Sequence, residues 1–427
     1  MKEDIQETRL PSGLTILTDR MPGVRSATLG FFFRKGARDE PGELHGISHF
    51  IEHTVFKGTA KRSALDIAIE QDRLGGNLDA FTTHEETGFA IKVIDDQLPR
   101  AFDLIADMLV HPRFDDTDLK AEQKVIIEEM KMIEDSPEEY LGEIFSEAFF
   151  PDHPLGASIA GTPKTVRSFE SETTRKYHNE VFNAANLVIA AAGNVDHQQI
   201  VELATSVWST DFSRPSPESP LKRGLQAPVT AAPILIKQNS NLEQAHLIIA
   251  TPFPSATDPG RYAADVLANI IGGGTSSRLW QKVREERGLA YSVGASSISY
   301  QDCGMFSIFA ATSPDQVEEV VDLSIAEMRA VVNDGVTGDE LELAKQQAVA
   351  SILLSLEDSA SRAAALAQGE MTHGRQIPVE ETLRRLDAVT TDDIHSLARE
   401  FFRTEKIAFA ALGDLSDLKI DRGRLAI

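Results

Sequence analysis

Residues 46–59 read GISHFIEHTVFKGT, and this segment decides how the rest of the chain is interpreted. His49 and His53 are four positions apart, so on a helix at about 100° per residue they lie one turn apart on one face. Two imidazoles at this spacing can bind one metal ion. Glu52 falls about 60° to the other side of His49, where it can act as general base on a metal-bound water. Taken alone, the motif is also compatible with chance in a chain that contains 11 histidines.

A catalytic zinc keeps three protein ligands and one open position, so the histidine pair requires a third ligand. Residues 118–134 (DLKAEQKVIIEEMKMIE) predict a strong helix. On this helix Glu122 and Glu129 are seven positions apart and share a face, whereas Glu128 points elsewhere. We predict Glu129 as the third ligand and Glu122 as a carboxylate that orients a ligand and tunes its basicity. The alternative is a charge-rich, solvated helix surface.

With these residues the chain resembles the pitrilysin/insulinase-type zinc peptidases. Within them it resembles the short branch that includes the mitochondrial processing peptidase β subunit and its bacterial relatives. In that family a ligand glutamate follows H-x-x-E-H in a V-I-x-x-E-like stretch, which Glu129 matches, and a second acid seven residues earlier matches Glu122. Further segments carry the resemblance, namely LPSGLT (10–15), GGNLDAFTT (75–83), NLEQAH (241–246) and GGGTSSRLWQKVREERGLAYSV (272–293).

The resemblance implies an α+β fold with two homologous domains, each a mostly antiparallel sheet packed with helices, which together form one half of a clam-shell. The Pro- and Ser-rich stretch after residue 212 is typical of an extended linker. We therefore expect a metal-binding catalytic domain at 1–213, a linker at 214–232 and a homologous domain without metal at 233–427. The cofactor implied is one Zn²⁺ per chain.

In the second half the resemblance singles out Arg284 and Tyr291, within VREERGLAY. In the family this pair faces the metal across a cavity, holds the substrate backbone and stabilises the tetrahedral oxyanion. Without the resemblance, a surface arginine and a packed tyrosine explain the same residues. The GGGTSS segment at 272–277 lacks the lysine of a phosphate-binding loop, so we interpret it as a turn after a helix.

Residues 78–82 (LDAFT) predict a strand after the turn at Gly75. In the family the matching edge strand pairs with the substrate backbone by β-augmentation. Asp79 stands where the family has asparagine, and a carboxylate accepts hydrogen bonds but does not donate them. The role of Asp79 in peptide binding is therefore open, whereas Ala80 matches and leaves room for a close backbone approach.

The formal net charge of −24 disfavours nucleic acid as a partner, because no basic stripe offsets it. If the charge lines a cavity it favours peptides with basic residues, and otherwise it serves solubility. No stretch reaches the roughly 18 apolar residues of a membrane span, and the N-terminus lacks the apolar run of a signal peptide. We expect a cytoplasmic, bacterial protein.

The resulting prediction is a zinc metalloendopeptidase that hydrolyses peptides or unfolded segments in an enclosed chamber. In the short branch of the family two chains supply the two halves of the shell. Because this chain holds both the metal residues and the Arg284/Tyr291 pair, we expect a homodimer with two composite sites. The alternative is a non-catalytic or partner-dependent scaffold subunit, and trimming of presequences versus general peptide degradation stays open.

Overall fold

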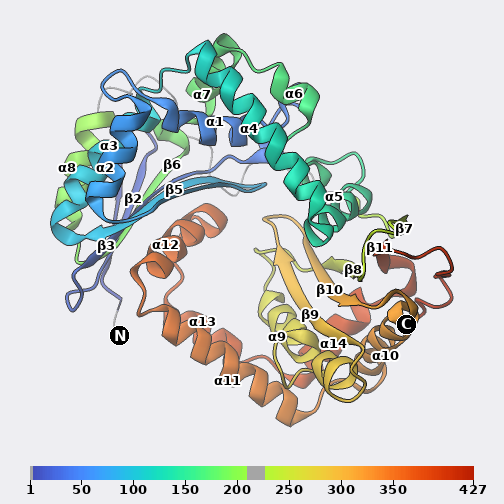
Figure 1. The fold of residues 1–427 in the computed structure, drawn as a ribbon. Coiled ribbons are helices and arrows are strands. Elements are labelled where there is room, and N and C mark those ends of the chain that lie inside the picture. Colours follow the sequence, from blue (N-terminus) through green and yellow to red (C-terminus); the bar gives the residue numbers. More distant parts are fainter. Residues whose placement is uncertain (1–2, 209–226) are drawn as a thin grey trace. The chain divides into compact units, whose positions relative to one another are not determined.

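The fold comes from a computed structural model that describes residues 3–208 and 227–427 (Figure 1). The described residues form two compact units, each assembled from three separate stretches of the chain. Unit 1 contains residues 3–131, 157–208 and 353–378, and unit 2 contains residues 132–156, 227–352 and 379–427. Most of the predicted linker, 214–232, lies outside the described residues, so the proposed domain boundaries stay a prediction.

A six-stranded sheet with the order β1-β2-β6-β3-β5-β4 forms the centre of unit 1. Its neighbouring strands are antiparallel, except that β2 and β6 are parallel. The strands are β1 (Ile5–Arg9), β2 (Thr15–Arg20), β3 (Ser26–Phe33), β4 (Leu78–Thr82), β5 (Thr87–Ile94) and β6 (Leu187–Gly193). The segment predicted as an edge strand, 78–82, is therefore β4, at one edge of this sheet.

Both faces of this sheet are covered, because side chains alternate between the faces along each strand. Phe31 of β3 points into the larger core, which the helices of the first half supply, whereas Phe32 packs against α12. The helices of unit 1 are α1 (Ile47–Thr54), α2 (Ala64–Leu74), α3 (Leu98–Val110), α4 (Asp116–Asp135, whose last turn belongs to unit 2), α6 (Pro163–Arg167), α7 (Ser171–Val181), α8 (His197–Trp208) and α12 (Ser359–His373).

Helix α12 comes from the second half of the sequence and lies across strands β2, β6 and β3 (Figure 1). Two buried ion pairs fasten it. Arg362 lies 2.6 Å from Asp19 of β2, and both side chains are 3% exposed. Glu370 is fully buried and accepts a hydrogen bond from Arg34 at 2.8 Å. In each pair the buried acid faces a buried arginine, so neither charge is left in the interior without a counter-charge.

Unit 2 is built on a five-stranded sheet with the order β7-β11-β8-β10-β9. Only β7 and β11 are parallel neighbours. The strands are β7 (Ile234–Gln238), β8 (Ala245–Phe253), β9 (Ala290–Ser299), β10 (Gly304–Thr312) and β11 (Ala408–Gly413). Order and direction repeat those of β2-β6-β3-β5-β4 in unit 1, so the two sheets share one topology.

The core of unit 2 also occupies both faces of its sheet. Helices from the second half cover one face, and α5, which comes from the first half, packs its Phe145 and Phe149 against β8 and β11 on the other. The helices of unit 2 are α5 (Pro137–Phe149), α9 (Arg261–Gly272), the π-helix η8 (Trp280–Glu285), α10 (Val317–Asp334), α11 (Gly338–Ser355), α13 (Val379–Asp387) and α14 (Thr391–Phe401).

These features confirm the predicted α+β class with two mostly antiparallel sheets. Each sheet receives one helix from the opposite half of the chain, α12 in unit 1 and α5 in unit 2. Among the described residues no helix combines the length and the apolar character that crossing a bilayer requires.

Candidate metal centre

Helix α1 carries the histidine motif, and its start is fixed by a glycine conformation and by a buried carboxylate. Gly46 precedes the helix with a φ of +94°, and a Cβ there would lie 2.5 Å from the carbonyl oxygen of Ala160. The buried carboxylate of Glu40 accepts hydrogen bonds from the backbone N–H groups of Gly46 at 2.8 Å and Ser48 at 2.7 Å. An anion at a helix N-terminus satisfies free donors and opposes the helix dipole. The position and direction of α1 are therefore tightly defined.

His49, His53 and Glu129 come together on the facing surfaces of α1 and α4. Nε2 of His49 lies 3.8 Å from Oε2 of Glu129, and Nε2 of His53 lies 3.6 Å from the same oxygen. Within residues 3–208 and 227–427, this is the one group of histidine, cysteine and acidic side chains whose ligand atoms all lie within 4.8 Å of one another. Tetrahedral zinc with bonds of about 2.0–2.1 Å needs separations of about 3.3 Å, so the two separations from Glu129 exceed this value by only a few tenths of an ångström.

Two observations at this cluster test whether it fits a cation. Oε2 of Glu129 is buried between the imidazoles and takes part in no hydrogen bond in the described part of the chain. Burial, together with the neighbouring His53, lowers the pKa of His49 to about 4, so this imidazole is neutral and its nitrogen lone pair is available. A neutral imidazole and an unsatisfied carboxylate oxygen are the donors that Zn²⁺ binds.

Glu122, which the sequence analysis predicts as an orienting carboxylate, lies next to His53. Its Oε2 lies 3.3 Å from Nδ1 of His53 and accepts a hydrogen bond from it, while its Oε1 pairs with Lys57 at 2.6 Å. Burial opposes ionisation of Glu122, but His53 and Lys57 outweigh this effect and lower its pKa. With Nδ1 committed to Glu122, the other nitrogen of His53 is directed toward Glu129. By contrast, Glu128 is exposed and pairs with Lys131.

Glu52 lies on α1 beside the histidines but outside the ligand group. Its side chain is buried, and Thr82 at the end of β4 donates a hydrogen bond to its Oε2 at 2.7 Å. Burial raises the pKa of Glu52, and the Thr82 hydrogen bond opposes that rise only in part. A buried carboxylate with a raised pKa next to an open metal position is suited to proton transfer.

Strand β4 connects this centre to the sheet edge. Ala80 is half-buried and packs against the unit 1 core, whereas Asp79 is exposed. Among the described residues the strand pairs with β5 on one side only, so its other side has no strand partner there. The strand is linked to α1 through Thr82 and Glu52.

Arg284 and Tyr291 belong to unit 2, where the structure brings them together. The Arg284 guanidinium carbon lies 4.5 Å from the centroid of the Tyr291 ring and 4.0 Å from that of Trp280. Tyr291 is 78% exposed, so its ring is not buried in the core, and the Arg284 guanidinium packs against it.

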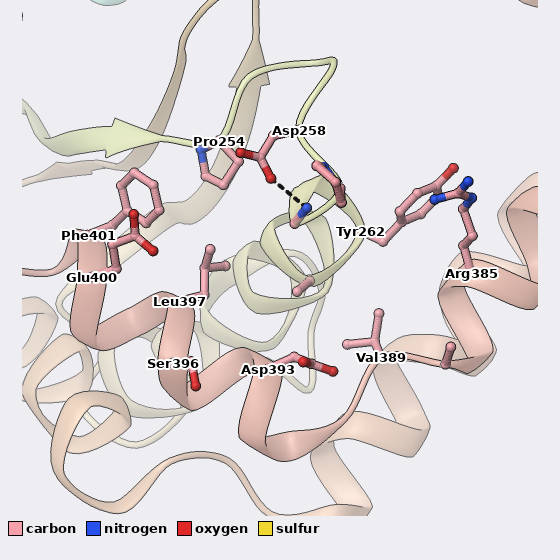
Figure 2. Close-up of a pocket in the computed structure, with 14 residues that line it drawn as sticks. Pro254, Asp258, Tyr262, Arg385, Val389, Asp393, Ser396, Leu397, Glu400 and Phe401 are labelled. Atoms are coloured by element: carbon pink, nitrogen blue, oxygen red, sulfur yellow. Dashed lines mark hydrogen bonds between the residues drawn. The ribbon is translucent and has the colours of Figure 1, made fainter.

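A hollow in unit 2 lies between α9, α13 and α14 and has a volume of about 480 Å³ (Figure 2). Three of its charged side chains have partners within the unit. Asp258 accepts a hydrogen bond from the backbone of Gly260 at 2.6 Å, Asp393 caps α14, and Arg385 pairs with Glu381 at 2.9 Å. None of the predicted site residues lines it.

Sequence reasoning missed Glu40, Lys57, Thr82 and Trp280. Lys57 stands four positions after His53, a helical spacing that could have suggested a shared face. Glu40 contacts backbone groups six and eight positions later, and Thr82 contacts Glu52, 30 positions earlier. Neither spacing belongs to a helical or strand periodicity.

In comparisons with known proteins, two segments of the chain match known protein families. Residues 15–163 match a family described as Insulinase (Peptidase family M16), and residues 168–348 match one described as Peptidase M16 inactive domain. The metal cluster lies within the first match, and Arg284 and Tyr291 lie within the second.

Two relatives extend these matches over nearly the whole chain. An uncharacterized zinc protease of Streptomyces coelicolor is 37% identical over 98% of this chain and 91% of its own length. One of Bacillus subtilis is 35% identical over 94% of this chain and 96% of its own length. Among solved structures, a peptidase M16 inactive domain from Pseudomonas fluorescens has a TM-score of 0.88 at 19% identity, covering 98% of this chain and all of its own. A protease from Helicobacter pylori has a TM-score of 0.86 at 19% identity, with 96% of this chain and all of its own covered.

Proposed function

The chain belongs to the M16 peptidase family, and on this premise we propose that it is a zinc-dependent endopeptidase that hydrolyses peptides or unfolded segments. His49, His53 and Glu129 would hold one zinc ion. The observation that carries the proposal is the convergence of these three side chains with Glu52 beside them on α1. The relatives named zinc proteases support the choice of metal.

When bound, zinc supplies a Lewis acid that acidifies a water molecule and polarises the substrate carbonyl. Glu52 takes the proton from the attacking water and later delivers it to the leaving amine. Burial raises the pKa of Glu52, and a carboxylate with a raised pKa is a better proton acceptor that can still release the proton afterwards. Thr82 holds the Glu52 carboxylate in one orientation through its hydrogen bond. Glu122 holds the ring of His53 in the same way.

Substrate binding would involve β4 and the Arg284/Tyr291 pair. The free edge of β4 can pair with an extended peptide, next to Ala80, and Thr82 links this strand directly to the proton acceptor. Asp79 would add negative charge at that edge and favour a basic side chain. Arg284 and Tyr291 would donate hydrogen bonds to the substrate backbone and to the oxyanion.

We further propose a homodimer in which each metal site is completed by the Arg284/Tyr291 pair of the partner, and an enclosed chamber that admits only unfolded chains. A cytoplasmic location belongs to the same proposal. Processing of defined presequences would be a narrower form of this activity.

The decisive experiment compares zinc-loaded wild type with E52Q at matched zinc content, on a fluorescence-quenched basic peptide of about 20 residues. The Gln substitution keeps the size of the side chain and removes the base. We expect cleavage by the wild type and a loss of roughly 10²- to 10⁴-fold in kcat for E52Q. Absence of cleavage by zinc-loaded wild type would overturn the proposal in favour of a partner-dependent or peptide-binding subunit.

Shared sites are tested by mixing E52Q with R284A under conditions that allow subunit exchange. A composite site predicts that the mixture recovers part of the activity that each variant lacks, since some dimers then contain one intact site. If subunit exchange is demonstrated and activity still does not recover, shared sites are contradicted, whereas the peptidase proposal stays intact.

A further inference from the structure

Two irregularities of the backbone meet around Arg284. Residues 280–285 form a π-helix, the least common helical type, and β9 contains a bulge where it pairs with β10. Ala311 pairs with Ser292 and Thr312 with Ala290, so Tyr291 has no residue opposite it. Both irregularities are common next to functional sites because they redirect a side chain.

The π-helix fixes the orientation of Trp280. Its i to i+5 spacing places Trp280 directly beside Glu285, and the indole Nε1–H donates a hydrogen bond to Glu285 Oε1 at 3.0 Å. Trp280 is therefore held at two points, by the helix backbone and by the hydrogen bond of its indole N–H. An α-helical turn at this point would place residue 284, rather than 285, nearest to Trp280 along the helix.

Between the Trp280 and Tyr291 rings lies the guanidinium of Arg284, 4.0 Å and 4.5 Å from their centroids. Its nearest acidic atom, Oε1 of Glu285, is 3.9 Å from Nε, too far for a hydrogen bond. Within residues 3–208 and 227–427, no hydrogen bond from the Arg284 side chain is found. The group is thus held through its faces, and its five N–H donors remain free for a ligand.

We propose that Trp280 is the positioning residue for Arg284: the indole face and the Tyr291 ring hold the guanidinium so that its N–H edge meets the carbonyl oxygens of a bound peptide. This inference rests on the proposed function, because it assumes that Arg284 binds substrate. It adds a residue that contacts no reacting atom and acts only through Arg284.

The test is a double-mutant cycle with W280F, W280L and R284A, measured as kcat/KM on the quenched peptide. Leucine removes the ring face that Arg284 contacts, so W280L should lose roughly 3- to 30-fold in kcat/KM. W280F keeps an aromatic face and should stay within about threefold of wild type. In the R284A background W280L should cause no further loss, because the interaction it removes is already gone. Equal losses in both backgrounds, or no loss in W280L, would overturn the proposal.

A readout without catalysis separates this inference from the peptidase proposal. The chain has two tryptophans, so W208F leaves Trp280 as the sole tryptophan, and excitation at the red edge of the absorption band selects its emission over that of the tyrosines. If Arg284 covers one face of the indole, R284A in the W208F background should shift the Trp280 emission and increase its quenching by acrylamide. Unchanged emission and quenching would overturn the positioning role, whether or not the wild type cleaves peptides. A wild type that is inactive with zinc bound would instead remove only the function on which the inference builds.

Discussion

Glu122 lies 3.3 Å from Nδ1 of His53 through one carboxylate oxygen and 2.6 Å from Lys57 through the other. Helix α4 therefore contacts α1 at two points, through Glu122 and, seven residues later, through Glu129, which lies 3.6 Å from Nε2 of His53. One helix therefore supplies both a candidate ligand and the group that orients another ligand.

Replacing this group should weaken metal binding. We predict that E122Q lowers zinc affinity roughly 10- to 100-fold, because His53 loses the charged acceptor that fixes its ring and raises its basicity. Competition with a chromogenic chelator measures the change. E128Q is the matched control, since Glu128 lies on the same helix but is exposed and paired with Lys131. Equal affinities of E122Q and wild type would show that Glu122 does not support the site.

The attachment of α12 should depend on its buried ion pair. D19N leaves the guanidinium of Arg362 buried without its counter-charge, and we expect unfolding to become easier by about 3–5 kcal/mol. Chemical unfolding followed by circular dichroism measures this. K92A breaks the exposed pair between Lys92 and Asp358, next to the same helix, and should cost less than about 1 kcal/mol. Similar effects of the two substitutions would contradict the assigned role of burial.

Gly46 offers a test of how α1 is held. G46A should destabilise the protein by about 1–3 kcal/mol and reduce zinc retention, because a Cβ at a φ of +94° meets the Ala160 carbonyl. G23A is the control, as Gly23 has open space around it and should change stability by less than about 0.5 kcal/mol. Normal zinc binding in G46A would mean that the metal residues tolerate a displaced helix start.

Acid stability should depend on Glu340 in unit 2. Burial disfavours its charge, but hydrogen bonds from Arg278 and Thr337 outweigh burial and lower its pKa to about 2. A carboxyl whose pKa is lower in the folded state stabilises the fold above its ordinary pKa of 4.5, and that stabilisation disappears as the pH falls from 4.5 toward 2.

E340Q should therefore be less stable than wild type by about 1–2 kcal/mol at pH 7, with the difference shrinking below pH 4.5. Unfolding curves at pH 7, 4 and 3 give the comparison. E342Q, on the same helix, serves as control because Glu342 is exposed and contacts only Gln346 among the described hydrogen bonds. A difference that stays constant across this range would contradict the assignment.

Much of the centre was predictable because its residues are encoded by spacing within single helices. His49, Glu52 and His53 share one turn of α1, and Glu122 and Glu129 share one face of α4, so helical periodicity sufficed. The need for a third zinc ligand predicted that the two helices meet, and the family resemblance supported this pairing. The Thr82 hydrogen bond depends on tertiary packing of separate segments, and the Glu40 cap is made by the irregular stretch just before α1. No periodicity reports either contact. The same holds for Trp280, whose contact with Arg284 arises from a π-helix and a bulge that have no simple sequence signature.

The crossing of α5 and α12 between the units has a consequence for synthesis on the ribosome. The unit 1 sheet is complete once β6 has emerged, yet Phe32 and Val188 on its outer face stay uncovered until α12 follows. At about 5–20 residues per second this interval lasts roughly 10–40 s. A nascent chain of this protein therefore carries an open apolar face for much of its translation. A fragment that stops before residue 353 would never lose it, so neither half of the gene encodes an independently finished product.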